Sequence, residues 1–241
     1  MVRAPVDLIV AAGSQDVVRA ARRDTDRIPI VMIAINYDPI EQGYAKSLAH
    51  PGGNLTGVFF RSLELAEKQI ELLRVMAPQA SQLAVLWGAE TQDEFASAQA
   101  GAKAQGWATR SIELGAPPYD FDAIFRRIAA EAPIVLVLST PAFAPHQQEV
   151  AAAALRYRLP AMFRFRSYVE AGGLMSYGVD NLALRRLAAG YVAKILTGAK
   201  PSELPIQQAD KFELVINKQT AAALGLTIPP LLLARADGVI E

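Results

Sequence analysis

The side chains of this sequence that could take part in catalysis are two serines and two histidines. Ser14 and Ser176 lie where apolar segments end, and His50 and His146 are the two histidines of the chain. A nucleophilic serine needs a nearby base and is usually presented in a Gly-x-Ser-x-Gly turn. Neither serine lies in that pattern, and His50 lies in a His-Pro-Gly-Gly turn while His146 begins a helical segment. We therefore expect both histidines to be structural or surface residues, and we predict no catalytic residues.

The sequence also has no motif that is typical of a metal or cofactor site. The sequence has no cysteine, which excludes disulfides, thiolate catalysis and zinc sites with cysteine ligands. It has no His-Glu-x-x-His segment, carboxylate cluster, Gly-x-Gly-x-x-Gly or phosphate-binding loop, the patterns that hold metals and nucleotides. The 24 basic and 24 acidic side chains balance, so nothing favours nucleic acid or an anionic membrane. We expect no metal, no cofactor and no nucleic-acid partner.

Three side chains suit either a structural role or the binding of a small polar molecule. Ser14 can cap the following helix, or its hydroxyl and the free backbone N–H groups there can bind a carboxylate. Asp38 can fix the turn before Pro39 or accept a hydrogen bond from a ligand ammonium group. Trp87 can pack in the core or stack on a ligand. The sequence leaves both interpretations open for each residue.

Two arginines near the end of an apolar segment, Arg164 and Arg166, present a similar choice. We expect each to lie in solvent, because arginine is rarely buried. Either guanidinium would nevertheless suit a ligand carboxylate.

Apolar segments with strand character alternate with helical segments along the chain. Strand patterns span residues 6–12, 28–35, 55–60, 83–87, 108–114, 134–138, 161–165, 174–177 and 212–216. Helical patterns span 16–24, 43–49, 63–76, 92–105, 121–131, 145–157, 168–171, 182–196 and 231–240. Regular alternation is typical of parallel sheets with right-handed crossovers and flanking helices, so the sequence predicts an α/β fold.

In parallel sheets, ligands bind beyond the carboxyl ends of the strands. Here these ends carry small, hydroxylated or aromatic residues, among them Gly13, Ser14, Gln15, Asn36, Tyr37, Asp38, Ser62, Trp87, Ser139, Ser176 and Tyr177. Such residues hold small polar molecules by hydrogen bonds and stacking.

Three segments are specific enough to indicate relatives: HPGGNLTG at residues 50–57, EAGGLMSYG at 170–178 and KFELVINKQTAAALGLTIPP at 211–230. With them, the chain from Val6 to Glu241 resembles the ABC-transporter substrate-binding protein family that includes tryptophan- and other amino-acid-type binding lipoproteins. The resemblance implies the architecture of type I periplasmic binding proteins, in which two α/β lobes joined by a hinge close over a ligand.

The resemblance also implies lobe boundaries and cleft residues. The first lobe would comprise residues 1–82 with 179–207, and the second would comprise 83–178 with 208–241. The first lobe would line the cleft with Gly13, Ser14, Gln15, Asn36, Tyr37, Asp38 and Ser62. The second lobe would contribute Trp87, Ser139, Phe163 or Arg164, Ser176 and Tyr177.

Members of this family usually carry an export signal and a strand–helix–strand–helix unit before the segment that matches Val6. Neither precedes it in this sequence, so we expect an N-terminally truncated first lobe. The strand at 6–12 would then be an interior strand without its neighbour, and an unpaired apolar strand edge favours pairing with another chain. We expect either that the sequence is a fragment or that a second copy covers this edge in a homodimer.

The resemblance implies the solute-binding component of an ABC importer, which binds a small polar organic molecule such as an amino acid. It would deliver this solute unchanged to a membrane permease and perform no catalysis. Its location would be periplasmic or extracytoplasmic, or cytoplasmic if Met1 is the true start, since no signal sequence precedes the first strand. Three alternatives stay open: an effector-sensing regulatory domain of the same fold, a truncated remnant that binds nothing, and a small-molecule α/β enzyme.

Overall fold

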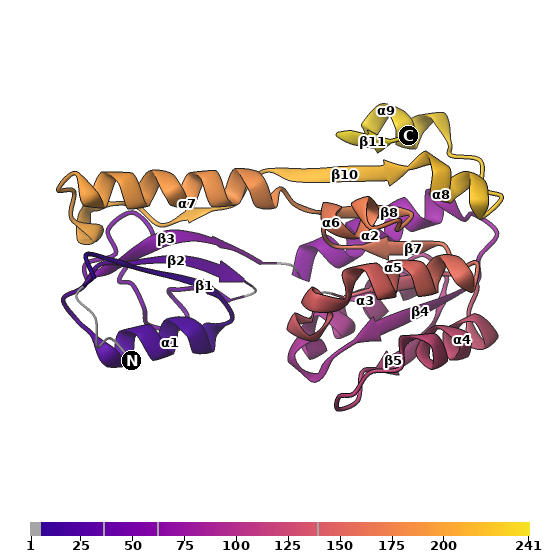
Figure 1. Ribbon diagram of the computed structural model, residues 1–241, viewed down its shortest axis with the longest axis horizontal. Coiled ribbons are helices and arrows are strands. Elements are labelled where there is room, and N and C mark those ends of the chain that lie inside the picture. The colour runs from indigo at the N-terminus through magenta and orange to yellow at the C-terminus, as the bar shows by residue number, and fades with distance from the viewer. Residues whose placement is uncertain (1–5, 36, 62, 139) are drawn as a thin grey trace. The chain divides into compact units, whose positions relative to one another are not determined.

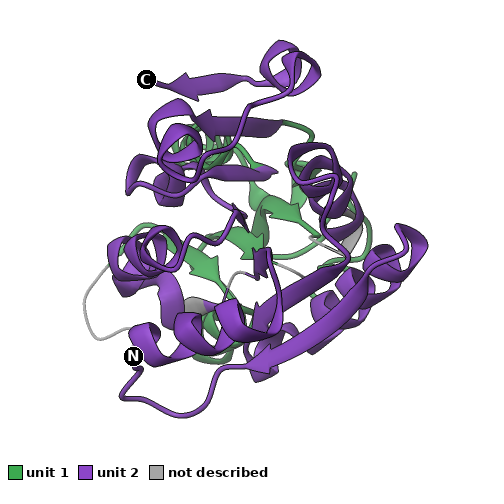
Figure 2. Cartoon of the chain, turned by 90° about the vertical axis from the view of Figure 1, so that its right-hand side faces the viewer, with its two compact units in different colours: residues 1–62, 179–211 green, residues 63–178, 212–241 purple. Residues whose placement is uncertain are grey.

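The computed structural model (Figure 1) describes residues 6–35, 37–61, 63–138 and 140–241. The chain divides into two compact units. Unit 1 comprises residues 1–62 and 179–211, and unit 2 comprises residues 63–178 and 212–241, as the colours of Figure 2 show. The α/β fold with parallel sheets and flanking helices is confirmed. The unit boundaries differ from the predicted ones at residues 82 and 207.

Helix α2 (Leu63–Met76) and strand β9 (Gln207–Gln208) account for the different boundaries. Ile70 and Leu73 of α2 are fully buried in the large hydrophobic cluster of unit 2, so this helix belongs to that unit. Strand β9 pairs with a strand of unit 1, and the Ala209 N–H donates to the Phe59 carbonyl at 2.8 Å. This pairing keeps the chain in unit 1 as far as residue 211.

The described residues of unit 1 form four parallel strands in the order β1-β2-β3-β9. The first three are β1 (Ile9–Gly13), β2 (Ile30–Ile35) and β3 (Leu55–Phe60). Helix α1 (Gln15–Asp24) contacts β1 and β2, whereas α7 (Asn181–Leu196) contacts β2 and β3. Figure 1 shows the two helices on opposite faces of the sheet. Every position of β3 is buried, as expected for a strand covered on both faces.

Gly57 allows the close approach of β3 to β2. Its φ is +138°, and a Cβ atom there would lie 2.1 Å from the Met32 carbonyl oxygen.

Replacing Gly57 with alanine should lower the free energy of unfolding by about 1–3 kcal/mol or more, because both the backbone conformation and the contact disfavour a side chain. Urea denaturation measures this change. Gly43→Ala is the matched control, since Gly43 has φ +66° but open space around its Cβ position. Equal losses in the two variants would contradict a role for the close approach.

Strand β1 lies at the edge of its sheet, because among the described residues it pairs with β2 alone. Ala11 is buried in the same cluster as Val18 of α1, whereas Val10 is 52% exposed. Successive residues of a strand point to opposite faces, so the face that carries Val10 lacks the cover that α1 gives to Ala11. The expected homodimer over this edge stays a prediction.

In unit 2, the residues that the structure describes form a seven-stranded sheet in the order β11-β10-β8-β7-β6-β4-β5. Its strands are β4 (Gln82–Trp87), β5 (Ala108–Glu113), β6 (Val135–Val137), β7 (Ala161–Phe163), β8 (Met175–Val179), β10 (Phe212–Asn217) and β11 (Gly238–Ile240). Neighbouring strands from β5 to β8 run parallel, as do β10 and β11. The carboxyl ends of β4, β6, β7 and β8 therefore lie along one edge.

Two hydrophobic clusters, one built with α2 and α3 and the other with α4 and α5, pack against the strands of unit 2. Besides α2, the described part of unit 2 has the helices α3 (Gln92–Ala104), α4 (Phe121–Glu131), α5 (Gln147–Arg156), α6 (Arg166–Glu170), α8 (Lys218–Ala223) and α9 (Pro230–Arg235). Short 3₁₀ helices span Ala89–Thr91, Pro141–His146 and, in unit 1, Pro201–Glu203.

Two of the predicted helices are wrong. Residues 43–49 form turns, in which the Tyr44 N–H donates to the Pro39 carbonyl at 2.8 Å. The predicted helix at 231–240 divides into α9 and β11. β11 pairs with β10, and the Asp237 carboxylate accepts a hydrogen bond of 2.8 Å from the Leu214 N–H, which draws the chain into the sheet.

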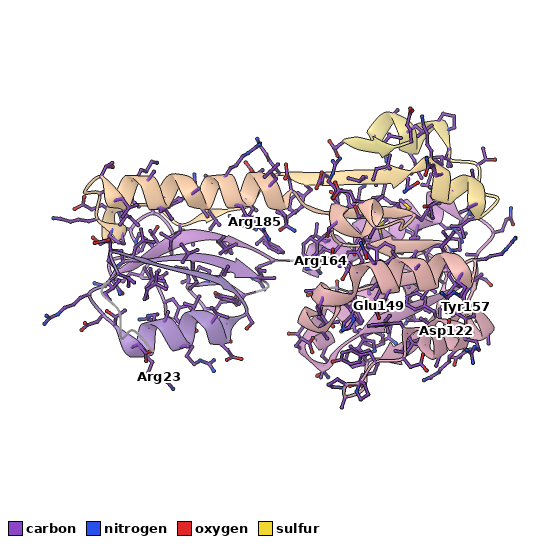
Figure 3. The ribbon with its side chains drawn as sticks, viewed as in Figure 1. Arg23, Asp122, Glu149, Tyr157, Arg164 and Arg185 are labelled. Atoms are coloured by element: carbon purple, nitrogen blue, oxygen red, sulfur yellow. The ribbon has the colours of Figure 1, made fainter. Side chains whose placement is uncertain are left out.

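An exposed network joins α4 to the end of α5 (Figure 3). The Asp122 carboxylate accepts hydrogen bonds from the Tyr157 hydroxyl at 2.7 Å and from the guanidinium groups of Arg156 and Arg126 at 2.6 Å each. The tyrosine hydroxyl, followed by the two guanidinium groups, lowers the pKa of Asp122 from 3.8 to about 2.

Because the pKa of Asp122 is lower in the folded chain than in the unfolded chain, the network stabilises the fold fully above about pH 4 and loses this effect as the pH falls to about 2. Asp122→Asn should therefore lower the Tm at neutral pH. The difference in Tm from the unchanged protein should shrink as the solution is acidified through this range. Thermal unfolding followed by circular dichroism measures it, and a difference that is the same at neutral and acid pH would contradict the assignment.

Candidate functional site

Ser14 lies at the junction of β1 and α1, at the carboxyl edge of the unit 1 sheet. It is the N-cap residue of α1, and its carbonyl accepts a hydrogen bond of 3.1 Å from the Val17 N–H. Its hydroxyl accepts no capping hydrogen bond, and the residue is exposed. Gly13 has φ +123°, a conformation that favours glycine. The capping interpretation of the Ser14 hydroxyl is therefore wrong.

The loop that follows β2 supplies the next predicted residues. The Gln15 side-chain amide donates to the Gln42 side-chain oxygen, which ties the start of α1 to this loop. The Asp38 carboxylate accepts hydrogen bonds from the backbone N–H groups of Ile40 at 2.7 Å and Glu41 at 3.4 Å. The turn-forming role of Asp38 is thus confirmed. Asn36 and Ser62 lie outside the described residues.

Tyr37 and Tyr44 form an aromatic pair in the same loop. Tyr37 is 7% exposed, its ring centroid lies 6.1 Å from that of Tyr44, and the rings are nearly perpendicular. The Arg22 guanidinium lies 5.0 Å from the Tyr44 centroid. Burial, with a smaller effect of Tyr44, raises the pKa of Tyr37. Both phenolic groups are buried without a hydrogen-bond partner among the described residues, so the neutral Tyr37 hydroxyl has unused hydrogen-bonding capacity.

Trp87 is the last residue of β4, at the carboxyl edge of the unit 2 sheet. Its indole Nε1–H donates to the Ser111 hydroxyl on β5 at 2.8 Å. Phe95 of α3 stacks on the indole with a centroid distance of 4.8 Å and an interplanar angle of 15°. Trp87 is partly buried against the α2–α3 cluster. Both predicted roles thus stay compatible with its position, and its orientation is fixed by two contacts.

Arg164 follows β7 (Figure 3). It is only 2% exposed, so the expectation that it lies in solvent is wrong. Its guanidinium forms an ion pair with the Glu94 carboxylate of α3, which is 3% exposed. Burial lowers the pKa of Arg164, and Glu94 acts in the opposite direction. Arg166 is a surface residue, as expected, and pairs with Glu170 at 2.8 Å. Arg164 thus pairs with a buried carboxylate on another helix, whereas Arg166 pairs with an exposed carboxylate four residues along the chain.

Phe163 and Ser176 are paired residues of β7 and β8 and share one face of the sheet. Phe163 is completely buried and stacks on Tyr168 at 4.9 Å, so its contribution in this structure is to the core. Ser176 is buried, and its hydroxyl has no hydrogen-bond partner among the described residues. Tyr177 is half-buried, with its ring 6.3 Å from that of Phe212. Ser139 lies outside the described residues.

The two histidines lie in separate parts of the structure and make different contacts. His146 lies 3.0 Å from the Glu149 carboxylate, and its ring packs near that of Phe121. His50 is exposed and donates its backbone N–H to Ser47. Within residues 6–35, 37–61, 63–138 and 140–241, no group of three potential metal ligands occurs. No helix in this part of the chain is long and apolar enough to cross a membrane.

Glu94 and Phe95 are contacts of the site that the sequence analysis missed. A signal for Glu94 was present, because Ala98 and Ala102 lie one and two turns further along α3 and are fully buried. This spacing puts Glu94 on the buried face of the helix, where a carboxylate needs a cation. No local sequence pattern indicated that Arg164 is this cation, because it lies 70 residues later in the sequence.

A cavity of about 560 Å³ occurs elsewhere in unit 1, beside the start of α7 and the segment after β9. Its walls carry both charges and several apolar side chains, from Val179, Asp180, Ala183, Leu184, Arg186, Leu187 and residues 207–211. None of the predicted site residues lines it.

The chain is similar to proteins that bind small molecules. A family model described as ABC transporter substrate binding protein matches residues 1–240. A tyrosine-binding protein of Clostridioides difficile (strain R20291) is 25% identical over 225 residues, which cover 91% of this chain and 63% of that protein. The chain thus spans less than two thirds of the length of this relative.

Two solved structures are similar over nearly the whole chain. One is an ABC domain from Streptococcus pneumoniae in complex with L-Trp, with a TM-score of 0.81 and 26% identity, covering 97% of this chain and 79% of that one. The other is a conserved domain protein from Vibrio cholerae O1 biovar eltor, with a TM-score of 0.81 and 29% identity, covering 98% of this chain and 79% of that one. The similarity extends over both units.

Proposed function

Because the chain belongs to the ABC transporter substrate-binding protein family, we propose that it is the solute-binding component of an ABC importer and that its solute is an amino acid with an aromatic side chain. Its two-unit α/β fold is like that of type I periplasmic binding proteins. The family match along residues 1–240 is the observation that supports this proposal most. The ligand class is suggested by the relatives that bind tyrosine and L-Trp.

The two ends of such a ligand need different partners. Its carboxylate would bind the Ser14 hydroxyl and the N–H groups at the start of α1, where the helix dipole favours a negative charge. Its ammonium group would bind Asp38, whose carboxylate oxygen still has lone pairs after the two backbone contacts. These residues all follow strands of unit 1.

The aromatic side chain of the ligand would contact unit 2. Trp87 offers a partly exposed indole, and Tyr177 a half-buried ring, at the ends of β4 and β8. Stacked or edge-to-face rings attract each other beyond the effect of burying apolar area. The ligand would be held in the interlobe cleft that the resemblance implies, and closure would be favoured because the ligand binds the closed form better.

The chemistry of this arrangement is binding and release. The solute would leave unchanged, and the receiving partner would be a membrane permease of an ABC importer. The chain would accordingly act in the periplasm or another extracytoplasmic space.

Ligand-dependent thermal unfolding tests the proposal. L-tyrosine, L-tryptophan and L-phenylalanine should raise the unfolding temperature more than L-leucine or L-alanine, and at 100 times the Kd the gain is about 2.7 kcal/mol. An unfolding temperature that no amino acid changes would favour the remnant that binds nothing. Chemical conversion of a compound in the panel would favour the enzyme.

A further inference from the structure

The indole of Trp87 is held on its edge and on one face. The Nε1–H donates to Ser111 at 2.8 Å, and the Phe95 ring lies parallel within 15° at 4.8 Å. The hydrogen bond fixes the rotation of the indole, and the stacked ring prevents it from folding toward α3. A rigid aromatic ring loses little conformational entropy when it binds another ring.

Phe95 reaches Trp87 because α3 begins almost immediately after β4. The two elements are joined by residues 88–91, in which the Gly88 N–H donates to the Thr91 hydroxyl at 3.1 Å and this hydroxyl donates to the Gly88 carbonyl at 2.9 Å. Glu94 and Phe95 lie in the first turn of α3. An ion pair that anchors Glu94 therefore also anchors the backbone turn from which the Phe95 ring projects.

Glu94 is fixed by Arg164, which comes from the end of β7, two strands away from β4 in the sheet. Both side chains are buried, at 5% exposure for Glu94 and 2% for Arg164. Two buried charges keep close contact, because separating them would leave each one desolvated without compensation. The backbone of Arg164 is also confined, since a Cβ atom at Gly178 of β8 would lie 2.1 Å from the Arg164 carbonyl oxygen.

We propose that Glu94, Phe95 and Arg164 are positioning residues that hold Trp87 as the stacking wall for the aromatic side chain of the solute. The proposal rests on the proposed function for the identity of the ligand. It assigns Arg164 an indirect role through Glu94 in place of direct contact with a ligand carboxylate. It also gives a role to a charged pair buried in the turn of α3 that carries Phe95.

The second tryptophan of the chain makes a spectroscopic test practical. Trp107 is buried, and its indole donates to the Ala80 carbonyl at 2.6 Å. The sequence has two tryptophans, so Trp107→Phe leaves Trp87 as the reporter. Near-ultraviolet circular dichroism and quenching by iodide then measure the orientation and exposure of Trp87 without any ligand.

The test compares Phe95→Leu and Arg164→Lys in the Trp107→Phe background. Phe95→Leu removes the stacked ring without leaving a buried charge, and Arg164→Lys keeps the charge but not the planar guanidinium. Both should weaken the near-ultraviolet signal and increase iodide quenching. Both should also reduce the ratio of L-tyrosine affinity to L-leucine affinity by about twofold to tenfold. Phe95→Tyr should retain all three properties, and Asp122→Asn is the control in which a different, exposed network is broken.

The outcomes distinguish failure of the positioning role from failure of the proposed ligand class. If Phe95→Leu and Arg164→Lys lower the unfolding temperature but leave the spectrum, the quenching and the affinity ratio unchanged, the residues are merely structural and the proposal is wrong. If the unchanged protein binds no aromatic amino acid, the proposed function fails. The quenching and the spectrum in the ligand-free protein then still decide whether these residues position Trp87.

Discussion

Replacing Glu94 with glutamine should lower the free energy of unfolding by about 3–5 kcal/mol. The buried Arg164 guanidinium would keep its charge but lose the carboxylate that offsets its desolvation. Folded domains are stable by only about 5–15 kcal/mol, so the variant would lose a large part of its stability. Urea denaturation followed by far-ultraviolet circular dichroism measures the loss.

The double variant Glu94→Met/Arg164→Met is the control for this prediction. Two apolar side chains of similar volume remove both charges together, and such replacements of buried ion pairs are often neutral or stabilising. We therefore expect the double variant to regain most of the lost free energy. Equal losses in the single and double variants would contradict the role of the uncompensated charge.

Replacing Ser14 with alanine should weaken the binding of an aromatic amino acid by about 1.5–3 kcal/mol, or roughly ten- to a hundredfold in Kd. This is the typical value of a hydrogen bond to a charged group. The stability of the ligand-free chain should not change, because the Ser14 hydroxyl is exposed and caps no backbone N–H group. Isothermal titration calorimetry gives the affinity, and thermal unfolding without ligand gives the stability.

Asp38→Ala is the matched comparison for Ser14→Ala. Because the Asp38 carboxylate holds the turn through the N–H groups of Ile40 and Glu41, its loss should cost about 1 kcal/mol of stability as well as affinity. If Ser14→Ala lowers stability as much as Asp38→Ala does, the hydroxyl is structural. If neither variant changes affinity, the unit 1 part of the proposed site is wrong.

The alternation of strands and helices was predictable because it depends on local apolar spacing. The structure has β3, α2 and α4 with the predicted bounds, since each shows a complete apolar pattern. β9 could not be predicted in this way, because its two residues are glutamines and show no apolar pattern. It is a strand because it pairs with β3. β11 likewise exists through its pairing with β10.

Local sequence patterns predict the candidate site only in part, for the same reason. Sequence position alone placed Ser14, Asp38 and Trp87 at strand ends, because the carboxyl edge of a parallel sheet follows from the order of elements. Whether a side chain there is exposed depends on partners that lie far away in the sequence. Arg164 is buried because Glu94 provides a countercharge, whereas Arg166, two residues later, lies in solvent with Glu170.

Equilibrium dialysis of the unchanged chain against isotopically labelled L-tyrosine, with chemical analysis of what the protein retains, tests the central claim most directly. We predict saturable retention that L-tryptophan reverses and L-alanine does not, with the tyrosine recovered intact. Retention that never saturates, or recovery of the label in a different compound, would contradict a protein that binds an aromatic amino acid and releases it unchanged.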